Sequence, residues 1–235
     1  MDYYLTLLSF GATGWGDEIA HGVLFTVSLA ICTLPVGLFM GFFLALGINS
    51  KEPSIQRAAK LFTIIFRGLP ELLTLFIVYY GGQILLNLLF QHVLGMEIEV
   101  NSFLAGMIAL AFVFSSYASE VFLSAFKGIP QGQYEGAFAL GLPWFKTMRL
   151  VIVPQLIKLA LPGLSNLWLI LLKDTSLVSI IGLTDTMFAT GLAARNTKEA
   201  FFFFALACVV YLALTFVSSM ALEAIEKRAR RGEVR

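Results

Sequence analysis

Ionisable side chains that lie inside long apolar stretches are the residues of this sequence whose type and spacing bear most on chemistry. Glu120 is the only charged residue between positions 102 and 124, and Tyr117 precedes it by one helical turn. An ionised group at the centre of a membrane helix costs about 2.5–3.5 kcal/mol even on lenient scales, so it has either a function or a partner. We interpret Glu120 either as part of a path for a polar solute or as a paired or snorkelling carboxylate.

A second polar group closes the fourth apolar stretch of the chain. It comprises Lys173, Asp174, Thr175 and Ser176, with Asn166 two turns earlier. Adjacent opposite charges neutralise each other locally, so a structural pair at a helix end explains this group as well as a lining of the same path does. Both interpretations stay open at the level of sequence.

Motifs for nucleotide binding and for hydrolysis are missing from the sequence. There is no Gly-x-x-x-x-Gly-Lys-Ser/Thr loop, no His-Glu-x-x-His and no spacing of a serine or cysteine triad. His21 and His92 stand at the ends of apolar stretches, and Cys32 and Cys208 lie inside them, which argues against a metal site and against a disulfide framework. We therefore expect no enzyme activity, metal or cofactor in this chain, and energy for uphill transport would come from a separate subunit.

Composition places the chain in a membrane. Of its 235 residues 58% are hydrophobic and 13% are charged, whereas soluble domains carry about 25% charged residues. The net charge of +1 gives no indication of nucleic-acid binding. Because a crossing helix needs about 20 mostly apolar residues, the sequence predicts an all-α membrane protein with five transmembrane helices. These spans cover residues 19–50, 72–90, 102–124, 151–172 and 200–222.

Two further features refine this prediction. The stretch 177–194 is apolar but contains glycines and an aspartate, so we interpret it as a short or re-entrant segment instead of a sixth span. Gly37 and Gly41 lie four residues apart on the first span, a spacing that predicts close packing of helices in lipid. Small residues of the third span, among them Ala118, offer the facing surface.

Orientation follows from the Lys and Arg residues of the connecting segments. Segments on alternate sides of the membrane carry 13 and 3 of the 16 basic residues. Basic residues favour the cytoplasmic side, so the sequence predicts an external N-terminal segment 1–18 and a basic cytoplasmic tail 223–235. With no Lys or Arg in 1–18, we do not expect a secretory leader.

The cytoplasmic segment 127–150 differs from the other connections. It reads as amphipathic helix, and Gly141-Leu142-Pro143 predicts a bend that breaks it into two short helices. Trp144 and Phe145 would then face water unless a second protein covers them, or unless the helices lie on the membrane surface. We favour docking to a second protein.

At this segment the sequence resembles the membrane-spanning permease subunits of bacterial ATP-binding cassette importers. Their cytoplasmic signature is Glu-Ala-Ala, three residues, Gly, nine residues and Ile-x-Leu-Pro. The chain has Glu135-Gly136-Ala137, then Gly141, then Val151-Ile152-Val153-Pro154 at the same spacing, with Gly136 in place of the middle alanine. The resemblance extends over nearly the whole chain.

Further motifs resemble the polar amino acid branch of this family, and within it the histidine/lysine/arginine/ornithine and opine permeases. They are Arg67-Gly68-Leu69-Pro70, the tyrosines before Gly81, and the run from Leu172 to Ser179. Each motif is weak alone, and together they are specific.

The resemblance implies an importer permease fold, in which 19–222 form the membrane domain in the inner membrane. It implies an ATPase dimer that holds ATP and magnesium, a second permease chain, related or identical, and a periplasmic or lipoprotein substrate-binding protein. Glu135, Gly136, Ala137, Gly141 and Pro154 would couple the chain to the ATPase, and the substrate would be a polar, basic amino acid or an opine. The alternative is a stand-alone secondary carrier or channel, for which we would expect internal repeats with broken helices in both halves.

Overall fold

The computed structural model describes residues 2–11, 14–94 and 101–230, and the regular elements of these ranges are all helices. They are α1 (Asp2–Leu7), α2 (Gly16–Ile48), α3 (Pro53–Gly68), α4 (Glu71–Phe76), a π-helical turn (Ile77–Gly81), α5 (Gly82–Leu94), α6 (Ser102–Gly128), α7 (Gln131–Ala139), α8 (Trp144–Thr147), a second π-helical turn (Met148–Ile152), α9 (Val153–Asp174), a 3-10 helix (Thr175–Ile181), α10 (Thr186–Thr197) and α11 (Ala200–Arg230). The predicted all-α class is confirmed.

Within these ranges, five stretches are long and apolar enough to cross a membrane, as the sequence predicts. They are Gly16–Ile48, Glu71–Leu88, Ser102–Gly128, Trp144–Ile181 and Ala200–Ala229. The fourth is longer than expected, because helix continues without a break from Trp144 to Ile181. The fifth continues into the basic end of the chain, so the predicted tail 223–235 begins as the last turns of α11. Residues 231–235 of that tail, 12–13 of the N-terminal segment and 95–100 before α6 lie outside the described residues.

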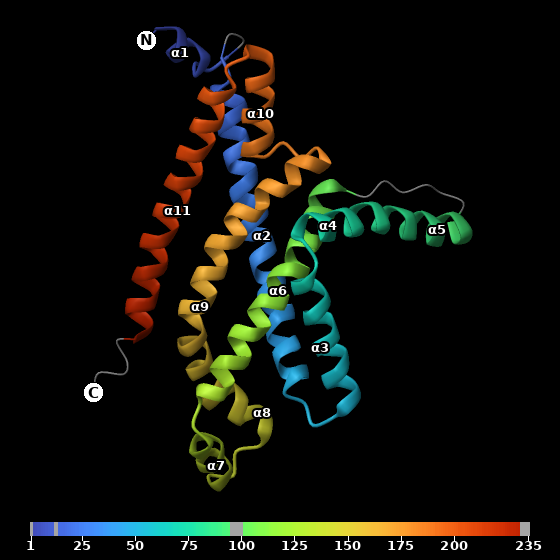
Figure 1. Ribbon diagram of the computed structural model, residues 1–235. Coiled ribbons are helices and arrows are strands. Elements are labelled where there is room, and N and C mark those ends of the chain that lie inside the picture. The colour runs from blue at the N-terminus through green and yellow to red at the C-terminus, as the bar shows by residue number, and fades with distance from the viewer. Residues whose placement is uncertain (1, 12–13, 95–100, 231–235) are drawn as a thin grey trace.

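The connection between the first and second spans contains a helix, α3, that the sequence does not predict. In Figure 1, α3 runs back alongside α2 and α6, whereas α4 and α5 extend crosswise, away from the long helices. The sequence places the second span at 72–90 and treats α3 as part of the connection. Hydropathy overlooks α3 because it carries Arg57, Lys60 and Arg67, while Ala59 and Thr63 form its buried face. Arg67 therefore lies in the last turn of α3, whereas the sequence assigns it to the connection before the second span.

Close packing of α2 on α6 forms the centre of the bundle, and it confirms the role predicted for the first-span glycines. A Cβ atom on Gly41 would lie 2.8 Å from the Cβ of Ala118, and one on Gly37 would lie 2.5 Å from the ring of Phe114. Both distances are shorter than real carbon contacts, so side chains at these positions would force the helices apart.

A smaller core joins α1, α2, α10 and α11 at one end of the molecule. It includes Leu7, Ile19, Ala193 and Phe203, all buried. The stretch 177–194 leads into this end in two parts. Its first part continues α9 as 3-10 helix to Gly182, whose φ of +86° turns the chain. Its second part lies in α10, which has 12 residues and is too short to cross a bilayer.

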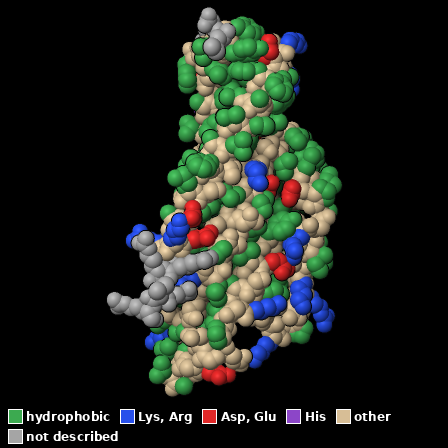
Figure 2. Space-filling model, turned by 60° about the vertical axis from the view of Figure 1, so that its left-hand side comes forward, with side chains coloured by type: hydrophobic (Ala, Val, Ile, Leu, Met, Phe, Trp, Pro, Cys, Tyr) green, Lys and Arg blue, Asp and Glu red, His purple; other side chains and the backbone are tan. Residues whose placement is uncertain are grey.

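Charge is distributed unevenly between the two ends. Figure 2 shows that Lys and Arg on the face it draws gather toward the lower half of the molecule, the half that carries α7 and α8 in Figure 1. The upper half of this face is mainly hydrophobic. This asymmetry agrees in sense with the one counted along the sequence.

Candidate functional site

Helix α7 and the bend that follows it form the outermost part of the lower end (Figure 1). Pro130, in an extended conformation, precedes α7, and the backbone N–H of Leu140 donates to the carbonyl of Gly136 at 3.1 Å as the helix ends. The N–H of Gly141 then donates to Phe138 at 2.9 Å. Gly141 has a φ of +75°, a region that residues with a Cβ rarely adopt, so glycine is what permits the turn. The predicted bend is confirmed.

The large apolar side chains of this segment are exposed and are not packed inside the bundle. Phe138 is 50% exposed and Leu140 82%, and beyond the bend Trp144 is 60% and Phe145 66% exposed. Glu135 and Gly136 are exposed beside them. Such a cluster is costly in water unless another surface covers it. Residues 131–150 carry this cluster, and we name them the coupling segment after the role predicted from the sequence.

The inner side of the coupling segment is anchored to the helix that follows it. Ala137 is buried, as are Met148 and Ile152 of the π-helical turn on which it packs. The side-chain amide of Gln155 donates to the side-chain oxygen of Gln133 at 3.1 Å and to the carbonyl of Val151 at 2.9 Å. A displacement of α7 would therefore be passed directly to α9.

Pro154 has a different position from the one predicted for it. The sequence places it at the end of the loop, where span four would start, but the helix begins at Trp144, ten residues before Pro154. The π-helical turn Met148–Ile152 ends two residues before the proline, and Val153 begins α9. A wider turn accommodates a residue that cannot donate a backbone hydrogen bond and whose ring crowds the preceding turn. Pro154 thus marks a distortion inside a continuous helix.

Glu120 is paired across the bundle with Arg67, a residue whose role the sequence does not reveal. The guanidinium Nη1 of Arg67 lies 2.9 Å from Oε1 of Glu120, and the guanidinium carbon lies 5.7 Å from the centre of the Tyr117 ring. The side chains of Arg67 and Glu120 are 42% and 43% exposed. A cavity of about 440 Å³ opens beside Glu120 between α6 and α9, with Gly128 and Gly163 in its lining. Of the two interpretations of Glu120, the paired carboxylate is observed directly. The Glu120 side chain also lines the cavity and stays partly exposed there.

The second predicted group does not meet the first. Lys173 is exposed and lines a hollow between α9 and α11 together with Ser176. Thr175 is fully buried, and its hydroxyl donates to the carbonyl of Leu172 at 2.8 Å. Asp174 interacts electrostatically with its neighbour Lys173 and with Glu71 at the start of α4, and Asn166 is exposed. The lining of the cavity at Glu120 includes no member of this group.

Asp185 is a buried acid that the sequence argument treats only as an interruption. It is fully buried at the start of α10, where its carboxylate accepts hydrogen bonds from the backbone N–H groups of Met187 at 3.2 Å and Phe188 at 2.9 Å. Burial raises the pKa of this carboxyl to about 6, and the hydrogen bonds from Phe188 and Met187 oppose that rise. An aspartate directly before a helix is a common N-cap, so this role could have been predicted.

Metal chemistry has no support in the part of the chain that the structure describes, since no cluster of three or more His, Cys, Asp or Glu side chains lies there in an arrangement fit to hold an ion.

Comparison with known proteins agrees with the predicted fold. Residues 34–231 match the family described as "Binding-protein-dependent transport system inner membrane component". The nopaline transport system permease protein of Agrobacterium fabrum is 39% identical over 231 residues, which cover 97% of this chain and 98% of that protein. An arginine ABC transporter permease protein of Escherichia coli is 40% identical over 223 residues, 89% of this chain and 94% of the relative.

One further relative and one solved structure match over most of the chain. The histidine/lysine/arginine/ornithine transport system permease protein of Escherichia coli is 34% identical over 215 residues, 92% of this chain and 94% of the relative. Among solved structures, an amino acid ABC transporter crystallised with histidines matches with a TM-score of 0.76 and 30% identity, covering 91% of this chain and 95% of the other.

Proposed function

The chain belongs to the family of binding-protein-dependent transport system inner membrane components, and from that premise we propose which solute it moves and how it is driven. It is a permease subunit of an ABC transporter in the inner membrane, not itself an enzyme, and it works with an ATPase and a substrate-binding protein. The solute is a basic amino acid or an opine. Two ATPase subunits, which hold ATP and magnesium, and a second permease chain complete the complex.

One observation carries the coupling mechanism: the exposed cluster of Phe138, Leu140, Trp144 and Phe145 stands on a segment fixed to α9. An ATPase surface that covers this cluster would grip α7 beside Glu135. Closure of the ATPase pair on ATP would then move α7, and the Gln133–Gln155 contact and buried Ala137 would pass that movement into the membrane helix. The permease would thus alternate between two states that nucleotide binding biases.

Support for a basic solute comes from the relatives and from charge. Permeases named for nopaline, arginine and histidine/lysine/arginine/ornithine transport match over most of this chain. Glu120 offers a half-exposed carboxylate at a cavity, and Tyr117 lies one helical turn before it with the Arg67 guanidinium over its ring. The carboxylate attracts a cation by Coulomb interaction. We assign Tyr117 and Glu120 to the substrate path, with Asn166, Lys173, Asp174, Thr175 and Ser176 as a second group further along it.

Orientation is part of the proposal. The N-terminus lies outside and the C-terminus in the cytoplasm, because basic residues gather at the end with the coupling segment (Figure 2). This places α7 and α8 where ATP is available.

The test is ATP hydrolysis by the assembled complex in the presence of loaded binding protein. Glu135→Arg reverses a charge at the surface that the ATPase would cover, and we expect it to abolish substrate-stimulated hydrolysis while the chain still inserts into the membrane. Glu52→Arg reverses an exposed charge at the same end but outside the coupling segment, and it should hydrolyse ATP as the parent does.

Two results would contradict the proposal. Normal coupling in Glu135→Arg would show that the ATPase does not grip this surface. Solute accumulation by the purified chain alone in vesicles, with no nucleotide present, would show a stand-alone carrier.

A further inference from the structure

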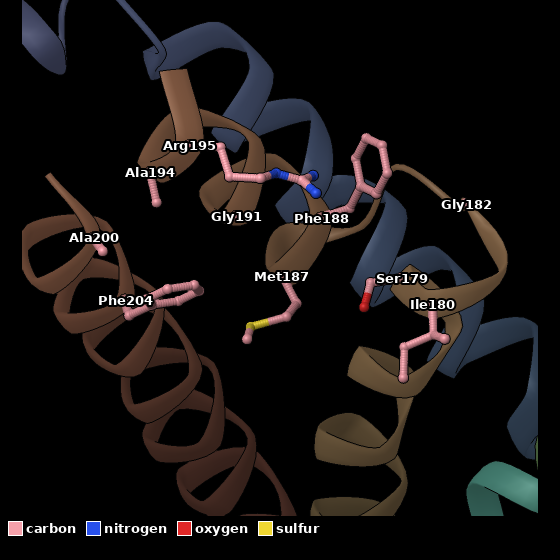
Figure 3. A pocket seen from close by; sticks show the side chains of 10 residues that line it. All are labelled: Ser179, Ile180, Gly182, Met187, Phe188, Gly191, Ala194, Arg195, Ala200 and Phe204. Atoms are coloured by element: carbon pink, nitrogen blue, oxygen red, sulfur yellow. The ribbon is translucent and has the colours of Figure 1, made fainter. Parts of the chain in front are cut away.

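An apolar groove runs along α11 at the end of the bundle opposite the coupling segment. Its first part is a cavity of about 570 Å³ between the 3-10 helix, α10 and α11, drawn in Figure 3. The side chains of Met187 and Phe204 point toward one another across the gap between α10 and α11 (Figure 3). Both also line a second hollow of about 400 Å³, which continues past Ala207 to Tyr211. The two hollows thus form one groove.

Charge in the groove is of one sign. Arg195 is the one charged side chain in the described lining of the first cavity, and Lys173 is the one in that of the second. Neither lining includes an acidic residue among the described positions. Lys173 has Asp174 beside it, but Arg195 takes part in neither ion pair found within the described ranges. Arg195 is therefore the cation of the groove that lacks a counter-charge.

The walls of the groove come from α11, from the end of the fourth apolar stretch and from α10, which is too short to cross the membrane. Phe204 is 41% exposed, Met187 37% and Ile180 54%, and Phe201 at the start of α11 is 90% exposed. In a bilayer such a surface faces acyl chains, whereas a guanidinium near the membrane boundary needs an anion. One kind of molecule satisfies both needs at once, because its phosphate pairs with a guanidinium and its chains are apolar.

We propose that this groove binds an anionic phospholipid, with the lipid phosphate at Arg195 and one acyl chain lying between α10 and α11 against Met187 and Phe204. The acyl chain makes van der Waals contacts along the groove that a free phosphate ion would lack. The charge of Arg195, with no described acid in the lining, favours a lipid with net negative charge over a zwitterionic one. The bound lipid would fill the space that separates α10 from α11.

The experiment measures lipid binding to the purified, delipidated transporter complex by native mass spectrometry. Phosphatidylglycerol is the probe, and phosphatidylcholine and inorganic phosphate are the comparisons. We expect Arg195→Gln to weaken phosphatidylglycerol binding by about tenfold or more, as the loss of a charge-assisted hydrogen bond predicts. Lys51→Gln removes an exposed charge far along the chain and should leave binding unchanged.

Gly191→Phe tests the groove without touching its charge. A Cβ atom at Gly191 meets nothing within 4 Å and Gly191 lines the cavity, so the new ring would occupy part of the groove. We expect it to weaken phosphatidylglycerol binding too, with a melting temperature like that of the parent.

Three results would overturn the proposal. Equal binding by Arg195→Gln and the parent would show that the guanidinium holds no lipid phosphate. Displacement of the lipid by an equal concentration of inorganic phosphate would indicate a site for a free anion. Loss of the second permease chain from the Gly191→Phe complex would show that the groove is a protein interface.

Discussion

The Nη1 atom of Arg67 lies 2.9 Å from Oε1 of Glu120, and this ion pair joins the end of α3 to the middle of α6. The same guanidinium lies over the ring of Tyr117, which sits one turn before Glu120. Arg67 is followed at once by the Gly68–Pro70 break, after which the chain turns crosswise into α4. The pair therefore holds α3 against α6 at the point where the chain turns from α3 into α4.

A double substitution separates the two roles that Glu120 can have. Glu120→Gln should lower uptake of arginine by up to about fivefold, the most that a half-exposed charge pair contributes, and should affect a neutral solute less. If Glu120 served only as the partner of Arg67, adding Arg67→Gln would restore uptake, because no unpaired guanidinium would remain. We expect the double variant to stay impaired for arginine in an uptake assay with labelled amino acids. Glu223→Gln, which also removes half of an ion pair, is the control.

Two glycines of the coupling segment should respond differently to alanine. Gly136 is helical and a Cβ there meets nothing within 4 Å, so Gly136→Ala should raise the stability of α7 by about 0.5–1 kcal/mol and keep ATPase coupling. Gly141 has space for a Cβ but a φ of +75°, so Gly141→Ala should cost about 1 kcal/mol or more and reduce substrate-stimulated hydrolysis. Melting temperature and ATPase rate of both variants are the measurements. Equal behaviour of the two would mean that the bend does not depend on its backbone conformation.

Overpacking at the α2–α6 contact should destabilise the bundle. Gly41→Leu places a side chain where even a Cβ would lie 2.8 Å from Ala118, and we expect a loss of about 1–3 kcal/mol in the free energy of unfolding. Gly81→Leu adds the same side chain where a Cβ meets nothing within 4 Å, and it serves as the matched control. The melting temperature in detergent reports both. A Gly41→Leu protein as stable as the control would show that α2 and α6 can separate at no cost.

Asp185 should make stability depend on pH in a defined window. Burial raises its pKa from 3.8 to about 6, so between these values the folded chain holds a proton that the unfolded chain has lost. The contribution of this carboxyl to stability is therefore greatest below pH 3.8, falls as pH rises to about 6 and then levels off.

Asp185→Asn removes this titration and keeps an oxygen that can cap α10. The stability of the variant relative to the parent should rise by about 3 kcal/mol between pH 4 and pH 7, measured by chemical unfolding in detergent. Glu52→Gln, which replaces an exposed acid far from α10 in the sequence, should show no comparable change. Parallel curves for Asp185→Asn and the parent would show that the carboxyl is not buried as described.

Most of what the sequence by itself determined is local. Apolar runs of sufficient length identify the membrane helices wherever no charge interrupts them, and Gly141-Leu142-Pro143 identifies the bend because only certain backbone angles suit these residues. The spacing of Glu135, Gly141 and Pro154 is likewise a local feature, and it indicates the permease family. Helix α3 escaped detection because its charged residues hide an amphipathic helix from a hydropathy average.

Relationships between distant residues were decided by tertiary structure alone. The sequence does not show that Arg67 pairs with Glu120 or that Gly41 packs against Ala118. It also does not show that Arg195 and Phe204 line the same groove. Hydropathy and residue spacing indicate which segments are helical and which of them are apolar. The contacts between distant residues depend on which helix faces pack together. Only that packing shows that Glu120 has a partner and that Arg195, in the part of the chain described, has none.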